Sequence, residues 1–205
     1  MVTKRKRRTE EIKGKKKKKR MKKSLLFVII TTIVVCLILF FVILFEYVFP
    51  PTKNNVAKKE KYEVVLYFSD ANERFLVPEK RFIPKEESTE GKARELVKAL
   101  LEGSKTKLVN TFPEKVVLES IKIDDKQTAY VSFDKNLIKF HPGGSASEMA
   151  TIYSLTNTLT RNISDIKRVK FLVDGKDVES IKGHIDTRQP FNMNKDLLAP
   201  GSKEG

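Results

Sequence analysis

The pattern of hydrophobic and polar residues divides the chain near its N-terminus. Residues 25–45 form a run without a charged side chain, in which Thr31 and Thr32 carry the only hydroxyl groups. A helix of this length spans about 32 Å, the thickness of a bilayer core. A buried core helix rarely exceeds about 14 wholly apolar residues. A cleaved signal peptide has a shorter apolar region that a small-residue site follows. The pattern therefore predicts a transmembrane helix over residues 24–49.

Beyond this span the periodicity of the apolar positions switches between that of strands and that of helices. Strands are indicated where β-branched and aromatic residues stand between turn-forming clusters. The expected strands cover residues 62–68, 74–77, 81–83, 117–123, 128–133 and 169–173. Apolar residues at helical spacing predict helices over residues 89–102, which ends at Gly103, and 145–162. Ser145 and Glu148 form a capping-box pattern at the start of the second helix.

The order strand, helix, hairpin, helix, strand predicts an α+β domain with two helices packed on one face of a small mixed or antiparallel sheet. The buried stripe of the second helix is expected to comprise Met149, Ile152, Tyr153, Leu159 and Ile163. Leu155 falls outside this stripe and is expected to be exposed, where it could contact a neighbouring copy. The predicted divisions are a basic tail at 1–23, a linker at 50–61, the folded domain at 62–191 and a flexible C-terminal tail at 192–205.

Charge is concentrated in front of the apolar run. Residues 1–23 hold fourteen of the 41 Lys and Arg residues and only two carboxylates, so they carry most of the formal net charge of +15. The remainder is nearly balanced, which removes the main support for nucleic-acid binding, because such binding requires basic residues spread over a folded face. By the positive-inside rule the tail is expected in the cytoplasm against anionic lipid, and the folded domain on the extracytoplasmic side of the cell membrane.

Few residues are candidates for chemistry. Cys36, the sole cysteine, lies within the apolar run, so no disulfide is expected in the domain, and no small residue precedes it as in a lipoprotein. The domain offers only His141 and His184, too few for a metal cluster. His184 stands two residues from Asp186, but this spacing specifies no triad geometry. We therefore predict no catalytic, cofactor-binding or metal-binding residue and no cofactor.

Two polar turns have simple interpretations. Asp124 and Asp125 lie between two expected strands and are predicted to be solvated. Gly143, Gly144 and Ser145 precede a helix and could present backbone N–H groups to an anion, as any helix N-terminus can. The sequence lacks the glycine spacing of a nucleotide-binding loop, so neither turn predicts a specific ligand.

Several segments follow one another in a distinctive order. They are residues 64–70 leading to 76–79, 96–103, Phe112-Pro113, 131–133 followed by Gly143-Gly144, 152–160, and 169–175 with 183–186 and Gln189-Pro190. Asn157-Thr158-Leu159 and the closing Gly183-His184-Ile185-Asp186 are the most specific of these. With them, residues 62–191 resemble the GerMN domain family of sporulation and spore germination.

The resemblance implies an extracytoplasmic, non-enzymatic domain of a spore-forming Gram-positive bacterium, similar to the ring-building folds of envelope assemblies. Unlike many relatives, which are lipoproteins or carry two such domains, this chain has a transmembrane helix and one domain. Asn157, Gly175, Gly183 and Pro190 are then expected to be structural.

The expected function is that of a membrane-anchored interaction or assembly module in sporulation, germination or cell-envelope maintenance. Its expected partners are envelope proteins or further copies of itself. The alternative is an enzyme, or an accessory of an enzyme, that acts on peptidoglycan.

Overall fold

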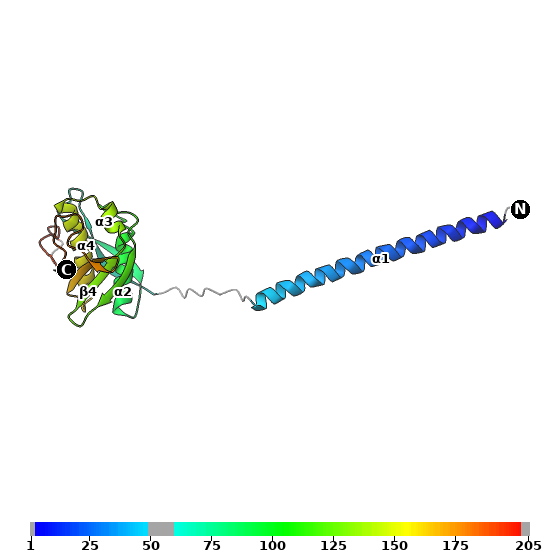
Figure 1. The fold of residues 1–205 in the computed structure, drawn as a ribbon, viewed down its shortest axis with the longest axis horizontal. Coiled ribbons are helices and arrows are strands. Elements are labelled where there is room, and N and C mark those ends of the chain that lie inside the picture. The colour runs from blue at the N-terminus through cyan, green and yellow to red at the C-terminus, as the bar shows by residue number, and fades with distance from the viewer. Residues whose placement is uncertain (1–2, 49–59, 202–205) are drawn as a thin grey trace. The chain divides into compact units, whose positions relative to one another are not determined.

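The computed structural model describes residues 3–48 and 60–201, which belong to two separate compact units (Figure 1). The first unit contains α1 (Thr3–Val48), a single continuous helix. Within it, the 21 residues Leu25–Phe45 are long and apolar enough to cross a membrane. The predicted apolar helix is therefore present as a candidate span. The predicted linker, residues 50–61, lies almost wholly outside the described residues.

Hydroxyl groups within the candidate span do not disturb its helix. Thr31 and Thr32 donate hydrogen bonds to the Val28 carbonyl oxygen, at 2.9 and 2.8 Å. Each hydroxyl is therefore satisfied inside the helix, which is the arrangement that a hydrocarbon environment requires. Cys36 lies exposed on the same helix.

The folded unit begins with a β-hairpin in which β1 (Lys61–Ser69) pairs antiparallel with β2 (Leu76–Pro84). The sequence pattern predicted two short segments where β2 is one strand, because Pro78 interrupts the alternation. Pro78 lies opposite Tyr67, whose N–H points away from β2 and donates to Thr158. The ladder needs no N–H from Pro78 at this position, so the strand continues through it.

The second long helix closes the other edge of β1 with polar side chains. This helix is α4 (Ser145–Asn162), as predicted. The Asn162 side-chain amide accepts a hydrogen bond from the Val65 N–H at 3.0 Å and donates to the Val65 carbonyl at 2.7 Å. One turn earlier, the Thr158 hydroxyl accepts from the Tyr67 N–H at 3.2 Å. A strand edge without a neighbouring strand must satisfy its backbone groups elsewhere, and here helix side chains do so.

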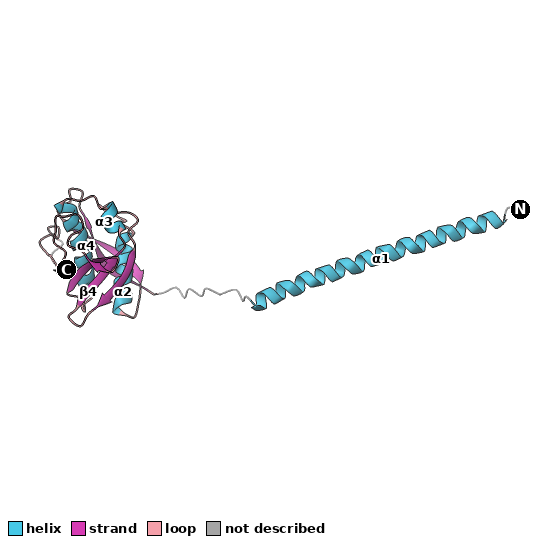
Figure 2. Cartoon of the chain, viewed as in Figure 1, coloured by secondary structure: helices cyan, strands magenta, loops and turns pink. Residues whose placement is uncertain are grey.

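Figure 2 shows the strands of the domain in magenta, with β4 labelled. A five-stranded mixed sheet occupies the rest of the domain, with strand order β3-β4-β5-β6 and β7 also paired with β5. Its strands are β3 (Leu118–Ile123), β4 (Thr128–Phe133), β5 (Arg168–Val173), β6 (Lys176–Asp177) and β7 (Phe191–Asn192). The β4–β5 pair is parallel and the other pairs are antiparallel. Parallel neighbours need a long connection, which α3 (Asn136–Phe140) and α4 supply. The predicted α+β class with a mixed sheet is confirmed.

The first long helix of the domain, α2 (Thr89–Leu101), begins where expected and ends one residue earlier than expected. Its N-cap is Ser88, whose hydroxyl accepts from the Gly91 N–H at 3.0 Å. It ends before Gly103, which has the positive φ of 80° that the sequence predicted there. Its buried side chains are Ala93, Leu96, Val97, Ala99 and Leu100. With this face α2 packs against β1, β2, β3 and α4.

Aromatic side chains link the strands at the centre of the core. The ring centroids of Phe112 and Phe133 lie 5.3 Å apart, and those of Phe133 and Phe171 lie 6.2 Å apart. Phe133 and Phe171 are fully buried. They stand on the adjacent strands β4 and β5, so the rings join the two hydrogen-bonded strands through side-chain contact as well.

The prediction that Leu155 is exposed is wrong, because this side chain is fully buried in the core. A single apolar stripe suffices for a helix that covers one face of a sheet. α4 instead contacts β1, α2, β5 and β7, so more than one of its faces is buried. Thr151, Ser154 and Thr158 are buried on it as completely as Leu155.

The predicted flexible tail is also wrong over the part that the structure describes. Asn157 of α4 donates to the Asn194 carbonyl and accepts from the Asn194 N–H, both at 2.9 Å. Further on, Leu198 is buried and bridges to Leu76 of β2. The chain is thus bound to the domain as far as Ala199, whose N–H donates to the Leu76 carbonyl at 3.0 Å, while residues 202–205 lie outside the described range.

Candidate functional site

A buried carboxylate on α4 holds His184 in place. Glu148 is fully buried, and its Oε1 lies 2.7 Å from His184 Nδ1. The backbone N–H groups of His184 and Ile185 also donate to this carboxylate, each at 3.2 Å. Burial would raise the pKa of Glu148, but the hydrogen bond from His184 and those from the backbone outweigh it and lower this pKa.

This arrangement replaces the predicted capping box. The N-cap of α4 is Gly144, no side chain caps this end, and Glu148 turns away from Ser145 toward the loop at 182–185. Ser145 and Glu148 have the spacing of a capping box, but in the folded domain the Glu148 carboxylate bonds to His184 and to the backbone of the loop instead. Glu148 therefore anchors a loop and does not begin a helix.

Asp186 does not join His184, although the two are close in sequence. Its carboxylate accepts from Arg188, at 2.8 Å from Nη2 and 3.0 Å from Nε. These hydrogen bonds lower the pKa of Asp186 to about 2. A histidine oriented by a carboxylate thus exists here, but its partner is Glu148 from α4, which sequence reasoning had assigned to a cap.

His141 is a loop residue, as expected, but it is buried. Its Nδ1 accepts from the Gly143 N–H at 3.0 Å, so this tautomer carries the ring proton on Nε2. Nε2 lies 2.9 Å from the Thr151 hydroxyl, which donates to the Thr111 carbonyl. Burial is the main reason that the pKa of His141 is lowered, while the nearby charge of Glu148 opposes the shift.

The contact between His141 and Thr151 resembles that of a nucleophile with its general base, but the hydrogen bond runs in the opposite direction. A general base must accept a proton from the hydroxyl, whereas His141 Nε2 donates to Thr151. Thr151 is also fully buried. The pair therefore acts as a structural brace between α4, the loop at 141–143 and the loop at Thr111.

Glu79 on β2 is a second buried carboxylate, and sequence reasoning missed it. Four donors in the loop after α2 reach its oxygens: the hydroxyls of Ser104 and Thr106, both at 2.7 Å, and the N–H groups of Lys105 and Thr106, at 3.0 and 3.1 Å. Arg81 pairs with it as well. Burial would raise the pKa of Glu79, but the hydrogen bonds from Thr106, Ser104 and Arg81 hold it at about 2. Only the strand register, which turns Glu79 inward, could have revealed this role.

The remaining polar candidates have local roles. Asp124 accepts from the N–H groups of Lys126 and Thr128, at 2.9 and 2.8 Å, and so organises the turn between β3 and β4. These backbone bonds lower the pKa of Asp124. Among residues 3–48 and 60–201, no three His, Cys, Asp or Glu side chains lie close enough together to hold a metal ion.

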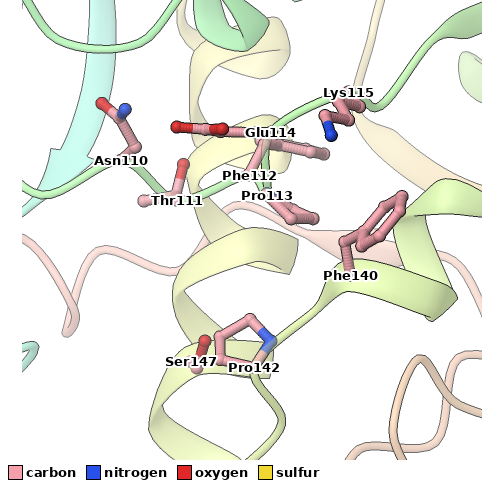
Figure 3. A pocket seen from close by; sticks show the side chains of 9 residues that line it. All are labelled: Asn110, Thr111, Phe112, Pro113, Glu114, Lys115, Phe140, Pro142 and Ser147. Atoms are coloured by element: carbon pink, nitrogen blue, oxygen red, sulfur yellow. The ribbon is translucent and has the colours of Figure 1, made fainter.

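A hollow of about 370 Å³ opens between the loop after α2, the end of α3 and the start of α4 (Figure 3). We call it the 110–115 hollow. Its lining residues are Asn110, Thr111, Phe112, Pro113, Glu114, Lys115, Phe140, Pro142 and Ser147. The volume lies near the lower end of the range of small-ligand sites, about 300–1,000 Å³. It combines apolar rings with a carboxylate, an ammonium, an amide and a hydroxyl, so it could bind a small polar ligand.

Buried hydrogen bonds fix the floor of this hollow. The Thr111 hydroxyl lies 2.6 Å from the Ser154 hydroxyl of α4, and the Thr111 carbonyl accepts from Thr151. The His141 ring braces Thr151 from the other side. These bonds use the polar groups beneath the floor, while the side chains of Asn110, Glu114, Lys115 and Ser147 line the opening. Sequence reasoning did not find this site, because its lining comes from two segments, residues 110–115 and 140–147, that are far apart in the sequence.

The family model described as "Sporulation and spore germination" (Germane) matches residues 65–179, more than half of the chain. No curated protein matches the sequence. Among solved structures, a protein from Clostridium perfringens described as a lipoprotein is similar, with 26% identity and a TM-score of 0.48. The match covers 68% of this chain and 93% of that one.

Two structures from Bacillus subtilis are also similar. The tandem GerMN domains of the sporulation protein GerM match with 20% identity and a TM-score of 0.50, over 67% of this chain and 48% of theirs. The first GerMN domain alone matches with 19% identity and a TM-score of 0.49, over 66% of this chain and 98% of its own. This chain thus spans about half of the tandem protein, and at this identity the likeness concerns the fold.

Proposed function

Because the chain belongs to the family described as "Sporulation and spore germination", we propose that it is a membrane-anchored extracytoplasmic module that assembles with envelope proteins. In this role Leu25–Phe45 holds the domain at the membrane. The basic residues before the span keep the N-terminus in the cytoplasm. The domain then contacts a partner, or further copies of itself, during sporulation, germination or envelope maintenance.

The observation that supports this proposal best is the structural role of the domain's buried polar groups. Glu79, Glu148, His141 and Thr151 all carry hydrogen bonds that hold loops to the core. In an enzyme, a buried reactive group usually faces a cleft in which a substrate can bind. These four side chains instead form hydrogen bonds within the scaffold. The arrangement favours a rigid binding module over an enzyme of the cell wall.

Anchoring concentrates such a module in two dimensions, so contacts that are weak in solution become effective. Within residues 60–201, the large apolar side chains that are exposed are Phe82, Val117 and Phe140. These positions are suitable for a photo-cross-linking amino acid in the full-length protein, expressed in a spore-forming host. Lys126, in the exposed turn between β3 and β4, is the matched control.

We expect at least one of the three apolar positions to give a discrete cross-linked product in membranes, and Lys126 to give none. Orientation is read in a variant with Cys36→Ser, because Cys36 is the sole native thiol. A cysteine placed at Lys126 in this background should react with a membrane-impermeant reagent in intact cells. Protection of that cysteine until the cells are lysed would overturn the proposed orientation, and absence of any product at all three positions would overturn the assembly role.

A further inference from the structure

The 110–115 hollow carries opposite charges on two sides. Figure 3 shows the Lys115 ammonium and the Phe140 ring on one side, and the Glu114 carboxylate with the Asn110 amide on the other. Glu114 and Lys115 are neighbours in the chain, yet within residues 60–201 neither forms an ion pair. Both charged groups are therefore available to a ligand.

Positive charge gathers around Phe140. This side chain is 42% exposed, and the ammonium groups of Lys139 and Lys115 lie 5.0 and 5.7 Å from the centre of its ring. The ring face attracts each cation, but the two cations repel one another. An anion beside them relieves this repulsion. A neutral sugar would have to stack on the ring face that the ammonium groups already occupy, so a carboxylate fits this side better.

The backbone holds Lys115 in position. Its φ is 67°, in the left-handed region that a residue with a Cβ adopts at a cost. The Asn136 side-chain amide donates to the Lys115 carbonyl at 2.9 Å, and the Asp134 carboxylate accepts from the Val117 N–H at 2.9 Å. These bonds come from the chain segment that leads into α3. The backbone from which the Lys115 side chain extends is therefore fixed at the edge of the hollow.

We propose that the 110–115 hollow binds a short peptide with both termini free. The peptide carboxylate lies against Lys115, and its ammonium group lies against Glu114. The hollow's volume of about 370 Å³ admits a ligand of about one to three residues. The Ser147 hydroxyl lines the same space and can bond the peptide groups, while Pro113 and Pro142 contact its side chains. This site goes beyond the proposed assembly role, which requires no small ligand.

The test uses the full-length protein in lipid nanodiscs and isothermal titration calorimetry. The probes are L-alanine, Ala-Ala and Ala-Ala-Ala, each compared with its N-acetyl and C-terminal amide derivatives. We expect one of the three lengths to bind with a Kd on the order of 0.1–1 mM. Blocking either terminus should weaken binding about tenfold, because each block removes one charge.

Two variants connect each terminus with its protein group. Lys115→Asn removes the ammonium while keeping a residue that tolerates positive φ, and it should abolish the difference between free acid and amide. Glu114→Gln should abolish the difference between free amine and N-acetyl peptide. Lys126→Asn, in a turn outside the hollow, is the matched control and should retain both differences. A misfolded variant would lose binding of every peptide. It could not remove the effect of blocking one terminus while keeping the effect of blocking the other.

Three results would overturn the peptide site. They are equal binding of free and blocked peptides, binding of a chitin oligosaccharide, titrated as the neutral-sugar probe, in place of every peptide, and no heat from any probe. Peptide binding and protein cross-linking are separate readouts, so failure of the peptide site leaves the cross-links at Phe82, Val117 or Phe140 to be judged independently.

Discussion

Replacing Glu79 by Gln removes the charge that holds the loop after α2 to β2. The Glu79 side chain is almost fully buried and accepts hydrogen bonds from Ser104, Lys105 and Thr106. A glutamine of the same shape keeps one acceptor oxygen but turns an NH₂ group toward these donors. The substitution therefore leaves buried donors without an acceptor in addition to removing the charge.

The magnitude follows from the pKa of Glu79. Folding lowers this pKa from 4.5 to about 2, and each unit corresponds to about 1.4 kcal/mol, so ionisation contributes about 3 kcal/mol to stability at neutral pH. Because the folded pKa is the lower one, this contribution is fully present above about pH 4.5 and is lost as the pH falls through 2. Between pH 7 and pH 3 about 2 kcal/mol of it disappears.

Urea unfolding of the compact unit Ala57–Gly205 measures this effect. Glu79→Gln should lower the free energy of unfolding at pH 7 by at least about 3 kcal/mol, and the difference from the parent should shrink by about 2 kcal/mol at pH 3. Glu63→Gln on the same hairpin is the control, because the pair of Glu63 with Lys80 is exposed. That change should cost less than about 1 kcal/mol at either pH. A Glu79→Gln difference that is equal at pH 7 and pH 3 would refute the reasoning.

Three further changes test the scaffold. Leu155→Ala should lower the free energy of unfolding by about 2–5 kcal/mol, as in a core cavity, and a thermal midpoint close to that of the parent would contradict its burial. His184→Ala removes one bond to the buried carboxylate of Glu148 and should cost about 1.5–3 kcal/mol in urea unfolding, with the backbone bonds to Glu148 retained. Because burial lowers the pKa of His141, stability should fall as the pH drops below about 6.5. His141→Asn should flatten this dependence in thermal melts between pH 7 and pH 5, and an unchanged slope would exclude His141 as its source.

The local elements of this protein could be predicted from its sequence because their signals are local. The helix at 89–102 depends on one apolar stripe and on Gly103, and the structure places both as expected. The turn at Asp124 depends on a carboxylate that bonds backbone groups within four residues. The apolar run at 25–45 needs only its own length and composition. In each case the interaction that decides the structure lies within the segment itself.

The positions that the sequence did not place correctly depend on partners far along the chain. Leu155 is buried because α4 contacts several elements, and no periodicity within one helix reports how many of its faces are covered. Glu148 has the spacing of a cap but bonds a loop 36 residues away. The lining of the 110–115 hollow likewise comes together only when α3 and α4 pack beside the loop after α2.

Sequence alone determined the two long helices, most of the longer strands and the class of this domain, since hydrophobic period, turn residues and charge act over a few residues. It did not predict the short elements α3, β6 and β7. Only the tertiary structure decided which polar side chains are buried and what they bind. Asn162 could complete the edge of β1, and Asn157 could hold the chain at Asn194, only after α4 had packed beside them. The physical reason is that a polar group enters the core only with a hydrogen-bonding partner, and packing, rather than sequence distance, supplies that partner.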